Sequence, residues 1–188
     1  NDLIDPEIRS KIICARDIPT SMGDMDISMY LLFQVIHEQA LVAISGEGAD
    51  ELFGGYPYFF NLLACESSNF PWMAGGDKKR RLGDSFLLHE LDIALDMDRY
   101  IKDIYNQSIV HVMRLDGDSD FEWTMRKTCY LSLTHFLRIL LDSIDRISTA
   151  VGLEVRLPFC DHRLVRYVYN KPWLLKTYDG RETCLLPV

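Results

Sequence analysis

The segment Ile44–Tyr56, which reads ISGEGADELFGGY, constrains the fold of this chain more than any other. It follows a short apolar run at residues 40–44, and such a run predicts a buried strand. The residues after the run are mostly small or acidic, so the backbone can turn tightly while several carboxylates crowd together. Since ligands of open α/β sheets bind at the carboxyl ends of strands, the pattern favours a site for a cation with a phosphate or acyl group. The alternative is an acidic loop that caps a helix beginning near Asp50.

The size and composition of the chain exclude several classes of function. With 188 residues, 48% of them hydrophobic and 26% charged, the chain has the composition of a globular domain with one core. Its net charge of −8 argues against nucleic-acid binding, and no apolar run reaches the ~20 residues that span a membrane. Five scattered cysteines without a CxxC pair fit a reducing compartment, so we expect a cytoplasmic protein.

Hydrophobic periodicity predicts a mostly helical chain. Residues 1–25, broken by Pro6 and Pro19, are expected to be irregular, and the one convincing strand is the run before the acidic segment. The turn at Asp116–Asp120 lacks the further oxygen ligands and the terminal glutamate of a calcium-binding EF-hand loop. Helices are expected at residues 27–39, 121–141 and 161–170, and residues 87–104 are expected to form one long helix or a pair. A helix is also expected to start within residues 50–63, where Gly54, Gly55 and Pro57 disturb it.

A second segment carries an equally long pattern. Asp145–Ser148 reads DRIS, and Gly152–Val165 reads GLEVRLPFCDHRLV. In spelling, order and separation, these residues and the first segment resemble the two signatures of the glutamine-hydrolysing asparagine synthetase family. The resemblance covers about residues 17–186, which is most of the chain.

The resemblance implies an α/β fold that is mostly helical, of the Rossmann-like adenine nucleotide alpha hydrolase (PP-loop ATPase) type. The family's synthetase domain opens with an SGGxDS pyrophosphate loop, and a glutaminase domain with an N-terminal cysteine precedes it. The sequence contains no SGGxDS loop, and Asn1 is not that cysteine. We therefore expect residues 1–188 to be a partial synthetase domain that is inactive alone.

The reaction implied by the resemblance has two steps. The side-chain carboxylate of aspartate attacks the α-phosphorus of ATP, which gives β-aspartyl-adenylate and pyrophosphate. Ammonia, released from glutamine in the glutaminase domain, then displaces AMP to give asparagine. Bringing a carboxylate against a polyphosphate requires charge neutralisation, so ATP and Mg²⁺ are the expected co-substrate and cofactor. The resemblance also allows a homodimer.

The first signature supplies the residues to which the resemblance assigns chemistry. Asp50 corresponds to a magnesium ligand, since a hard cation prefers carboxylate oxygen. Ser45, Gly46 and Gly48 correspond to residues that line the adenylate with backbone groups. Glu47 corresponds to the glutamate that activates ammonia or holds the acyl-adenylate. Because related β-lactam synthetases have tyrosine at this position, Glu47 favours asparagine synthesis.

Two further site residues lie outside the first signature. Asp26 follows Asp24 in a segment similar to one that helps the family bind aspartate or nucleotide, so Asp26 is expected to contact the nucleotide. A pair of helix-capping carboxylates is the alternative, and the DxD metal motif of a nucleotide-sugar transferase is a weaker one, since three-residue patterns arise often by chance. Arg146 is expected to act in catalysis by facing pyrophosphate.

Other charged residues of the two segments are expected to be structural. Glu154, Arg156 and Asp161 are predicted to form a buried ion-pair network that shapes the floor of the pocket. Glu51 is predicted to cap its helix or to form an ion pair.

One position departs from the family pattern. Near its C-terminal end the family commonly has Gly-Arg-Glu-Lys, with a lysine that stabilises charge at the reacting groups, and this chain has Thr183 there. A hydroxyl cannot replace an ammonium at a polyanionic transition state. Either Lys176 compensates, or the correspondence is shifted, or the site is degenerate. A non-catalytic paralogue and a β-lactam synthetase-like amide-forming enzyme therefore stay open as alternatives.

Overall fold

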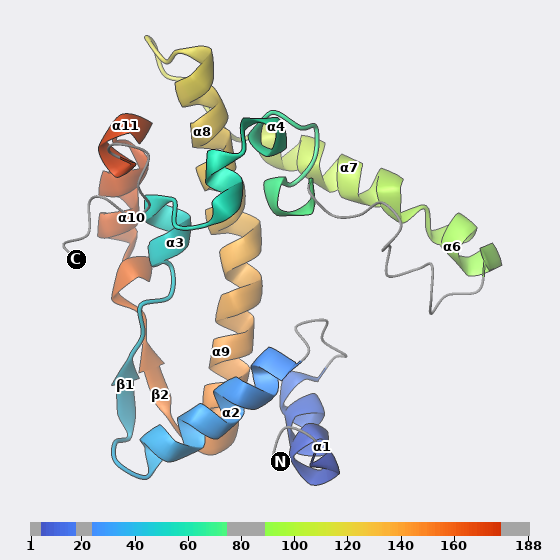
Figure 1. Cartoon of the computed structure of the whole chain (residues 1–188), viewed down its shortest axis with the longest axis vertical. Coiled ribbons are helices and arrows are strands. Elements are labelled where there is room, and N and C mark those ends of the chain that lie inside the picture. Colours follow the sequence, from blue (N-terminus) through green and yellow to red (C-terminus); the bar gives the residue numbers. More distant parts are fainter. Residues whose placement is uncertain (1–4, 18–23, 75–88, 178–188) are drawn as a thin grey trace. The chain divides into compact units, whose positions relative to one another are not determined.

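The structure is a computed structural model and describes residues 5–17, 24–74 and 89–177 (Figure 1). The chain divides into two compact units. The first comprises residues 1–48 and 135–165, and the second comprises residues 49–134 and 166–188. Each unit has hydrophobic clusters of its own.

The first unit begins with helix α1 (Pro6–Arg16), where the sequence predicted an irregular segment. The carboxylate of Asp5 accepts a hydrogen bond of 2.8 Å from the backbone N–H of Glu7 and so caps the helix. Pro6 lies in the first turn, where its missing N–H has no helical partner to lose. For residues 5–17 the prediction was therefore wrong, because Pro6 begins a helix instead of breaking one.

A parallel two-stranded sheet pairs β1 (Val42–Ile44) with β2 (Glu154–Arg156), and the two arrows lie side by side in Figure 1. The predicted strand is confirmed, but its predicted burial is wrong, since Ile44 is 77% exposed. Among the described residues only β2 pairs with β1, so the other edge of β1 is uncovered. β2 was not predicted, because its two charged residues leave no apolar run.

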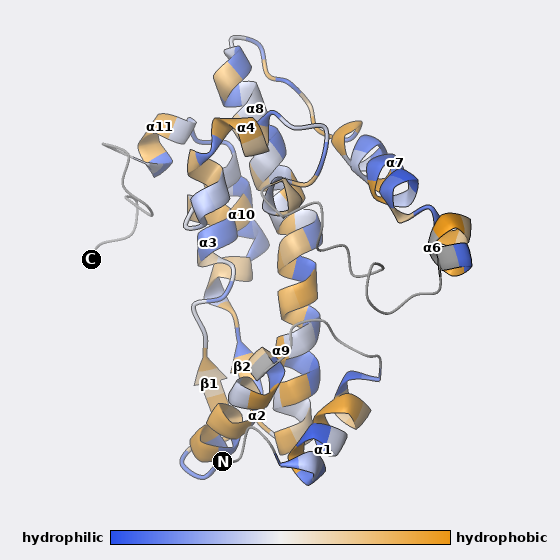
Figure 2. Ribbon diagram, turned by 45° about the vertical axis from the view of Figure 1, so that its right-hand side comes forward, coloured by the Kyte–Doolittle hydropathy of each residue, from blue (hydrophilic) through white to orange (hydrophobic). Residues whose placement is uncertain are grey.

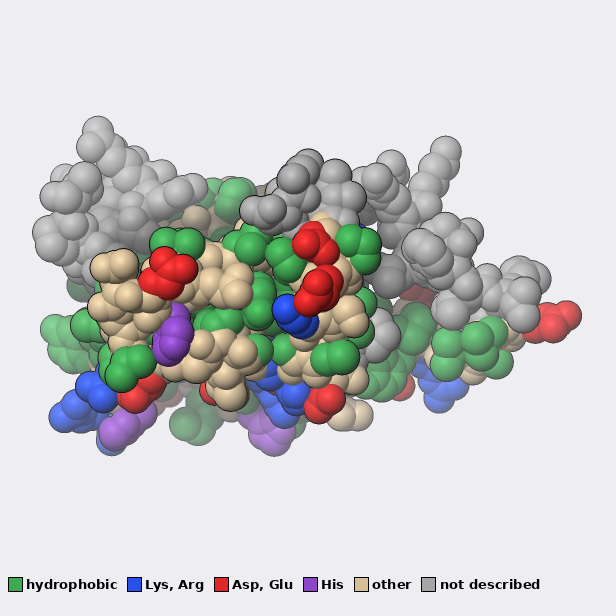
Figure 3. Space-filling view, turned by 90° about the horizontal axis from the view of Figure 1, so that it is seen from below, with side chains coloured by type: hydrophobic (Ala, Val, Ile, Leu, Met, Phe, Trp, Pro, Cys, Tyr) green, Lys and Arg blue, Asp and Glu red, His purple; other side chains and the backbone are tan. Residues whose placement is uncertain are grey.

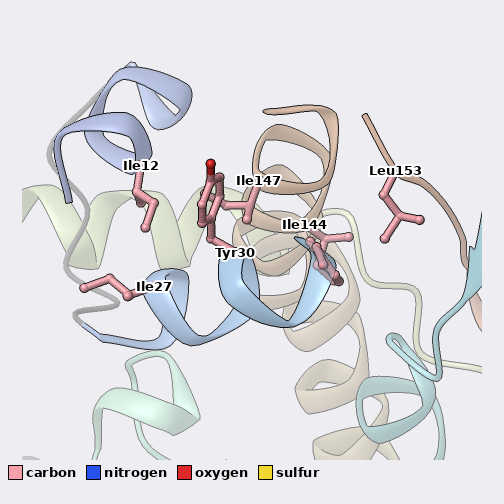
Figure 4. Close-up of a cluster of buried hydrophobic side chains, with 7 residues drawn as sticks. Ile12, Ile27, Tyr30, Ile144, Ile147 and Leu153 are labelled. Atoms are coloured by element: carbon pink, nitrogen blue, oxygen red, sulfur yellow. The ribbon is translucent and has the colours of Figure 1, made fainter. Parts of the chain in front are cut away.

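Three helices enclose the core of the first unit. Figure 4 shows Ile12 of α1 and Tyr30 coming together with Ile144 and Ile147, and Ile147 has no exposed surface. Leu153, just before β2, extends this cluster toward the sheet. The two helices that join α1 here are α2 (Asp24–His37) and α9 (Leu137–Val151).

The second unit is helical in the residues that the structure describes. The helix predicted at 121–141 is interrupted by a π-helical turn at Ser132–Phe136 and then continues as α9. Both α7 and α8 carry hydrophobic and hydrophilic residues around their circumference (Figure 2). Among the described residues, the α-helices that lie wholly in this unit are α3 (Ala49–Phe53), α4 (Leu62–Cys65), α6 (His89–Leu95), α7 (Met97–Ile109), α8 (Asp120–Leu131) and α11 (Trp173–Lys176). Helix α10 (His162–Tyr169) spans the boundary between the units.

Buried hydrophobic clusters and an ion pair stabilise the second unit. One cluster includes Phe59, Met125 and Trp173, and another consists of Phe70, Tyr105 and Leu131. In the turn before α8, the carboxylate of Asp118 accepts hydrogen bonds of 3.0 and 3.2 Å from Arg126. The predicted turn is confirmed, and this arginine occupies the carboxylate that a calcium loop would need for its ion.

The mostly helical chain with a small parallel sheet agrees with the predicted α/β class, while the PP-loop ATPase type stays a prediction. Charged side chains of both signs are interspersed on the face drawn in Figure 3. Within the described residues, no helix combines the length and the apolar character needed to cross a membrane.

Candidate active site

The sheet brings the two signature segments together. Val42 pairs with Glu154 and Ile44 with Arg156, in parallel register. One residue further, the backbone N–H of Ser45 donates a hydrogen bond of 2.9 Å to the carbonyl of Arg156. Both signature segments then leave the sheet at the carboxyl ends of their strands, which is where open α/β sheets bind ligands.

Beyond the strands, Cys160 of the second signature contacts the first signature. Its Sγ lies 3.8 Å from the carbonyl oxygen of Glu47, to which the thiol donates a weak hydrogen bond. Gly48 has a φ of +92°, and a Cβ there would lie 2.9 Å from the same sulfur, so both the backbone angle and the close approach require glycine. The hydroxyl of Ser45 accepts a hydrogen bond of 3.3 Å from the N–H of Glu47 and tightens the turn.

Gly46 differs from Gly48, because a Cβ built on it would meet no atom within 4 Å. Its backbone is exposed at the end of β1. The glycine at this position is thus not explained by contacts among the described residues, and a ligand has room to approach its backbone.

Asp50 lies in α3, in the second unit. Its carboxylate is exposed, and within residues 5–17, 24–74 and 89–177 it has no hydrogen bond or ion pair. This unengaged oxygen donor suits Mg²⁺, which proteins commonly bind through one or two carboxylates plus phosphate oxygens. The described residues contain no group of three or more His, Cys, Asp or Glu side chains that could hold a metal. Asp50 therefore fits as one ligand of an ion that arrives with a polyphosphate.

Glu51, the neighbour of Asp50, is a structural residue. It is fully buried, and its Oε1 accepts a hydrogen bond of 2.8 Å from the hydroxyl of Tyr56. The hydrogen bond connects α3 with the end of the first signature and offsets part of the cost of burying this carboxylate.

Asp26 lies in α2 and is 1% exposed. Its Oδ1 accepts a hydrogen bond of 2.5 Å from the hydroxyl of Ser143, and its Oδ2 faces Nε of Arg16 at 3.6 Å. Arg16 also binds Asp142 at 3.1 Å. The carboxylate thus joins α1, α2 and α9, which gives it a role in packing. The predicted contact with nucleotide stays a prediction.

Arg146 projects from α9 and is engaged by two carboxylates. Its Nε donates a hydrogen bond of 2.9 Å to Asp142, and an NH group of its guanidinium lies 3.4 Å from Asp17. The guanidinium lowers the pKa of Asp142 below its ordinary value. Its side chain is 37% exposed, so an anion can still reach it. Its predicted role toward pyrophosphate is not tested by these contacts.

The predicted buried network of Glu154, Arg156 and Asp161 was wrong. Glu154 and Arg156 do form an ion pair of 2.8 Å, but their side chains are 58% and 66% exposed. Asp161 instead binds Arg163 at 2.6 Å, and this arginine lowers the pKa of the carboxyl. A strand of three residues at an open edge cannot bury such side chains.

A cavity of about 390 Å³ lies in the first unit, along α9 and β2. Asp145 of the second signature and Glu154 line it, together with hydroxyl and apolar residues. The predicted adenylate residues 45–48 are not part of its lining.

Two residues that contact the first signature escaped the sequence analysis: Cys160, beside Glu47 and Gly48, and Trp173, whose ring lies against Gly54. A cysteine within a signature and a tryptophan after proline carry no local signal of contact with a glycine loop far away in the sequence. Lys176 is 2% exposed and its Nζ lies 3.8 Å from the sulfur of Cys129, so in the second unit it does not present its ammonium to solvent. Thr183 lies outside the described residues.

Comparisons with known proteins agree with the two signatures. The family model described as asparagine synthase matches residues 1–186. The chain is 37% identical over 186 residues to "Asparagine synthetase [glutamine-hydrolyzing] 3" of Bacillus subtilis, which covers 98% of the chain and 29% of that protein. It is 26% identical over 163 residues to "Asparagine synthetase [glutamine-hydrolyzing]" of Gallus gallus, which covers 85% of the chain and 19% of that protein. The chain therefore spans less than a third of the length of these relatives, and it belongs to the asparagine synthase family.

Proposed function

We propose that the natural protein containing this chain makes asparagine from aspartate, with ATP and ammonia as co-substrates. The observation that carries the proposal is the meeting of the two signatures at the carboxyl ends of β1 and β2, where Cys160 contacts the backbone of Glu47. The names of the relatives, both asparagine synthetases, support the same reaction.

In the proposed first step, the carboxylate of aspartate attacks the α-phosphorus of ATP, and pyrophosphate leaves. Ser45, Gly46 and Gly48 line the resulting β-aspartyl-adenylate with backbone groups. The open space at Gly46 supports this assignment. Arg146 stabilises the departing pyrophosphate, because a guanidinium matches the geometry of phosphate oxygens.

Charge neutralisation is the second requirement of this step. Asp50 would supply one carboxylate oxygen to Mg²⁺, whose positive charge would lower the repulsion between the attacking carboxylate and the polyphosphate. The exposure of Asp50 and the absence of a partner for it among the described residues support this role.

In the proposed second step, ammonia displaces AMP and must lose a proton. Glu47 accepts that proton or orients the acyl group, since a carboxylate near the attacking nitrogen can act as general base. The ammonia is proposed to come from glutamine hydrolysed by a glutaminase domain outside this chain, as the names of the relatives indicate.

The test is aspartate-dependent exchange of labelled pyrophosphate into ATP by the full-length natural protein. Asp50→Asn is expected to lower the exchange rate about 10²-fold or more, as the loss of one charge-stabilising group typically does. Asp116→Asn is the matched control, since Asp116 is another exposed carboxylate of the second unit without a partner in the described part of the chain. No aspartate-dependent exchange by the wild type would refute the function and favour a non-catalytic paralogue. Exchange triggered by a carboxyethyl-amino acid instead of aspartate would favour the β-lactam alternative.

Glu47→Gln separates the two steps. If Glu47 serves the second step, the variant keeps pyrophosphate exchange but forms asparagine at least about 10²-fold more slowly. Glu38→Gln, at an exposed position of the same unit, is the control. Equal loss of both activities would contradict this division of roles.

A further inference from the structure

Trp173 is fixed from two directions within the second unit. It is 4% exposed and is the first residue of α11. Its backbone N–H donates hydrogen bonds of 2.9 and 3.1 Å to the two carboxylate oxygens of Glu122 in α8. Its indole stacks on Phe59, with the ring centroids 5.2 Å apart and the planes inclined by 24°. These contacts hold the indole in one position.

The Trp173 indole lies against Gly54 of the first signature. Gly54 has a φ of +78°, and a Cβ built on it would overlap the outer edge of the Trp173 ring. Two other ring atoms would lie only 3.1 and 3.3 Å from that Cβ. The indole consequently limits the path that the backbone can take at this glycine.

Gly54 and Gly55 connect this backbone path to Asp50. The N–H groups of Gly54 and Gly55 both donate hydrogen bonds of 2.9 Å to the carbonyl of Asp50. A Cβ on Gly55 would overlap the carboxylate of Asp50, which means that this carboxylate packs directly on the Gly55 backbone. The two glycines are thus explained separately, one by the indole and the other by the carboxylate.

We propose that Trp173 is a positioning residue for the Asp50 carboxylate, acting through the Gly54–Gly55 backbone. The inference rests on the proposed function, in which Asp50 binds the divalent cation. Trp173 itself touches neither metal nor substrate. It removes the freedom of the turn, so that Asp50 holds one orientation before the ion arrives, and preorganisation of this kind raises affinity.

The test measures binding of Mn²⁺, in the presence of α,β-methylene ATP, to the full-length natural protein by water-proton relaxation. Trp173→Phe keeps an aromatic ring beside Phe59 but removes the outer atoms that contact Gly54. It is expected to raise the Kd for Mn²⁺ about tenfold, as changes in supporting residues around metal ligands do. Trp123→Phe makes the same chemical change elsewhere in the second unit, where the ring contacts Lys127, and is expected to leave Kd unchanged.

A double substitution distinguishes positioning from general stability. Gly54→Ala places a methyl group against the indole and is expected to weaken Mn²⁺ binding, and Trp173→Phe added to it is expected to restore part of the affinity by making room. Gly55→Ala, which leaves Trp173 in place but displaces the Asp50 carboxylate, is expected to weaken binding as well. A role confined to stability would move the unfolding midpoint of these variants and leave Kd unchanged, and that result would overturn the proposal.

Asp50→Asn in the same assay distinguishes a failure of the proposed metal role of Asp50 from a failure of the proposed role of Trp173. If it leaves Kd unchanged, the metal role of Asp50 is refuted and this inference with it. If it weakens Mn²⁺ binding while Trp173→Phe and Gly54→Ala do not, the inference alone is refuted and the proposed function stands.

Discussion

Replacing Asp26 by asparagine tests whether this carboxylate supports the fold or binds nucleotide. Asp26 is 1% exposed, and Arg16, which is 3% exposed, faces it at 3.6 Å. Asparagine keeps the size of the side chain and can still accept the hydrogen bond from Ser143, so the substitution removes mainly the charge. Removing one partner of a buried ion pair costs about 3–5 kcal/mol. Because Arg16 keeps Asp142 at 3.1 Å, we expect the free energy of unfolding to fall by about 3 kcal/mol, the lower end of that range.

The free energy of unfolding is measured by urea titration of the full-length natural protein, together with native-state hydrogen exchange of the amides of α1 and α2. Asp17→Asn is the matched control, because it makes the same change at a carboxylate that is 79% exposed. Asparagine tolerates the left-handed backbone of residue 17, so we expect a loss below about 1 kcal/mol there. If Asp26→Asn costs no more than this control and raises the KM for ATP, the structural role is refuted and the carboxylate belongs to the nucleotide site.

Three further predictions follow from the site and its surroundings. Gly46→Ala is expected to lower pyrophosphate exchange without changing the unfolding midpoint, whereas Gly48→Ala should lower both. Only the Cβ at position 48 would meet a protein atom, and only Gly48 has a left-handed φ. Equal unfolding midpoints for the two variants would contradict this reasoning. Cys14 is expected to react with Ellman's reagent in the native protein at pH 8, while Cys129 reacts only after unfolding, since burial makes it inaccessible and raises its thiol pKa. The arginine partner of Asp118 lowers the pKa of that carboxyl, so its stabilising effect is complete above the unfolded pKa of about 3.9 and is lost as the pH falls through the folded pKa. In acid titrations of unfolding, the difference between wild type and Asp118→Asn should therefore shrink below about pH 4, and a constant difference would contradict this.

The sequence was sufficient where the signal is local. The periodicity of α2 and the apolar run of β1 predicted both elements close to their observed bounds. The sequence was insufficient for α1, because Pro6 is as compatible with a helix start as with a break. It was also insufficient for β2, because the strand conformation of β2 comes from pairing with β1. The predicted burial of β1 failed for a related reason, since burial depends on what covers a strand and not on the strand itself.

The site shows the same limit. The two signatures indicated which segments belong together, and the sheet confirms that they adjoin. The contact between Cys160 and Glu47, and the position of the Trp173 indole against Gly54, depend on packing between residues far apart in the sequence. At Asp26 the sequence resemblance indicated a nucleotide contact, but it could not indicate that Arg16 of another helix faces this carboxylate in the core.

The edge of β1 that pairs with no strand in the described part of the chain has a consequence for handling the protein. Leu41, Val42 and Ile44 are 70%, 40% and 77% exposed, and among the described residues only β2 pairs with this strand. An apolar strand with unpaired backbone groups is a template for strands of other molecules. A polypeptide of these 188 residues is therefore expected to aggregate through this edge, and Ile44→Lys should increase the soluble fraction recovered from expression cultures.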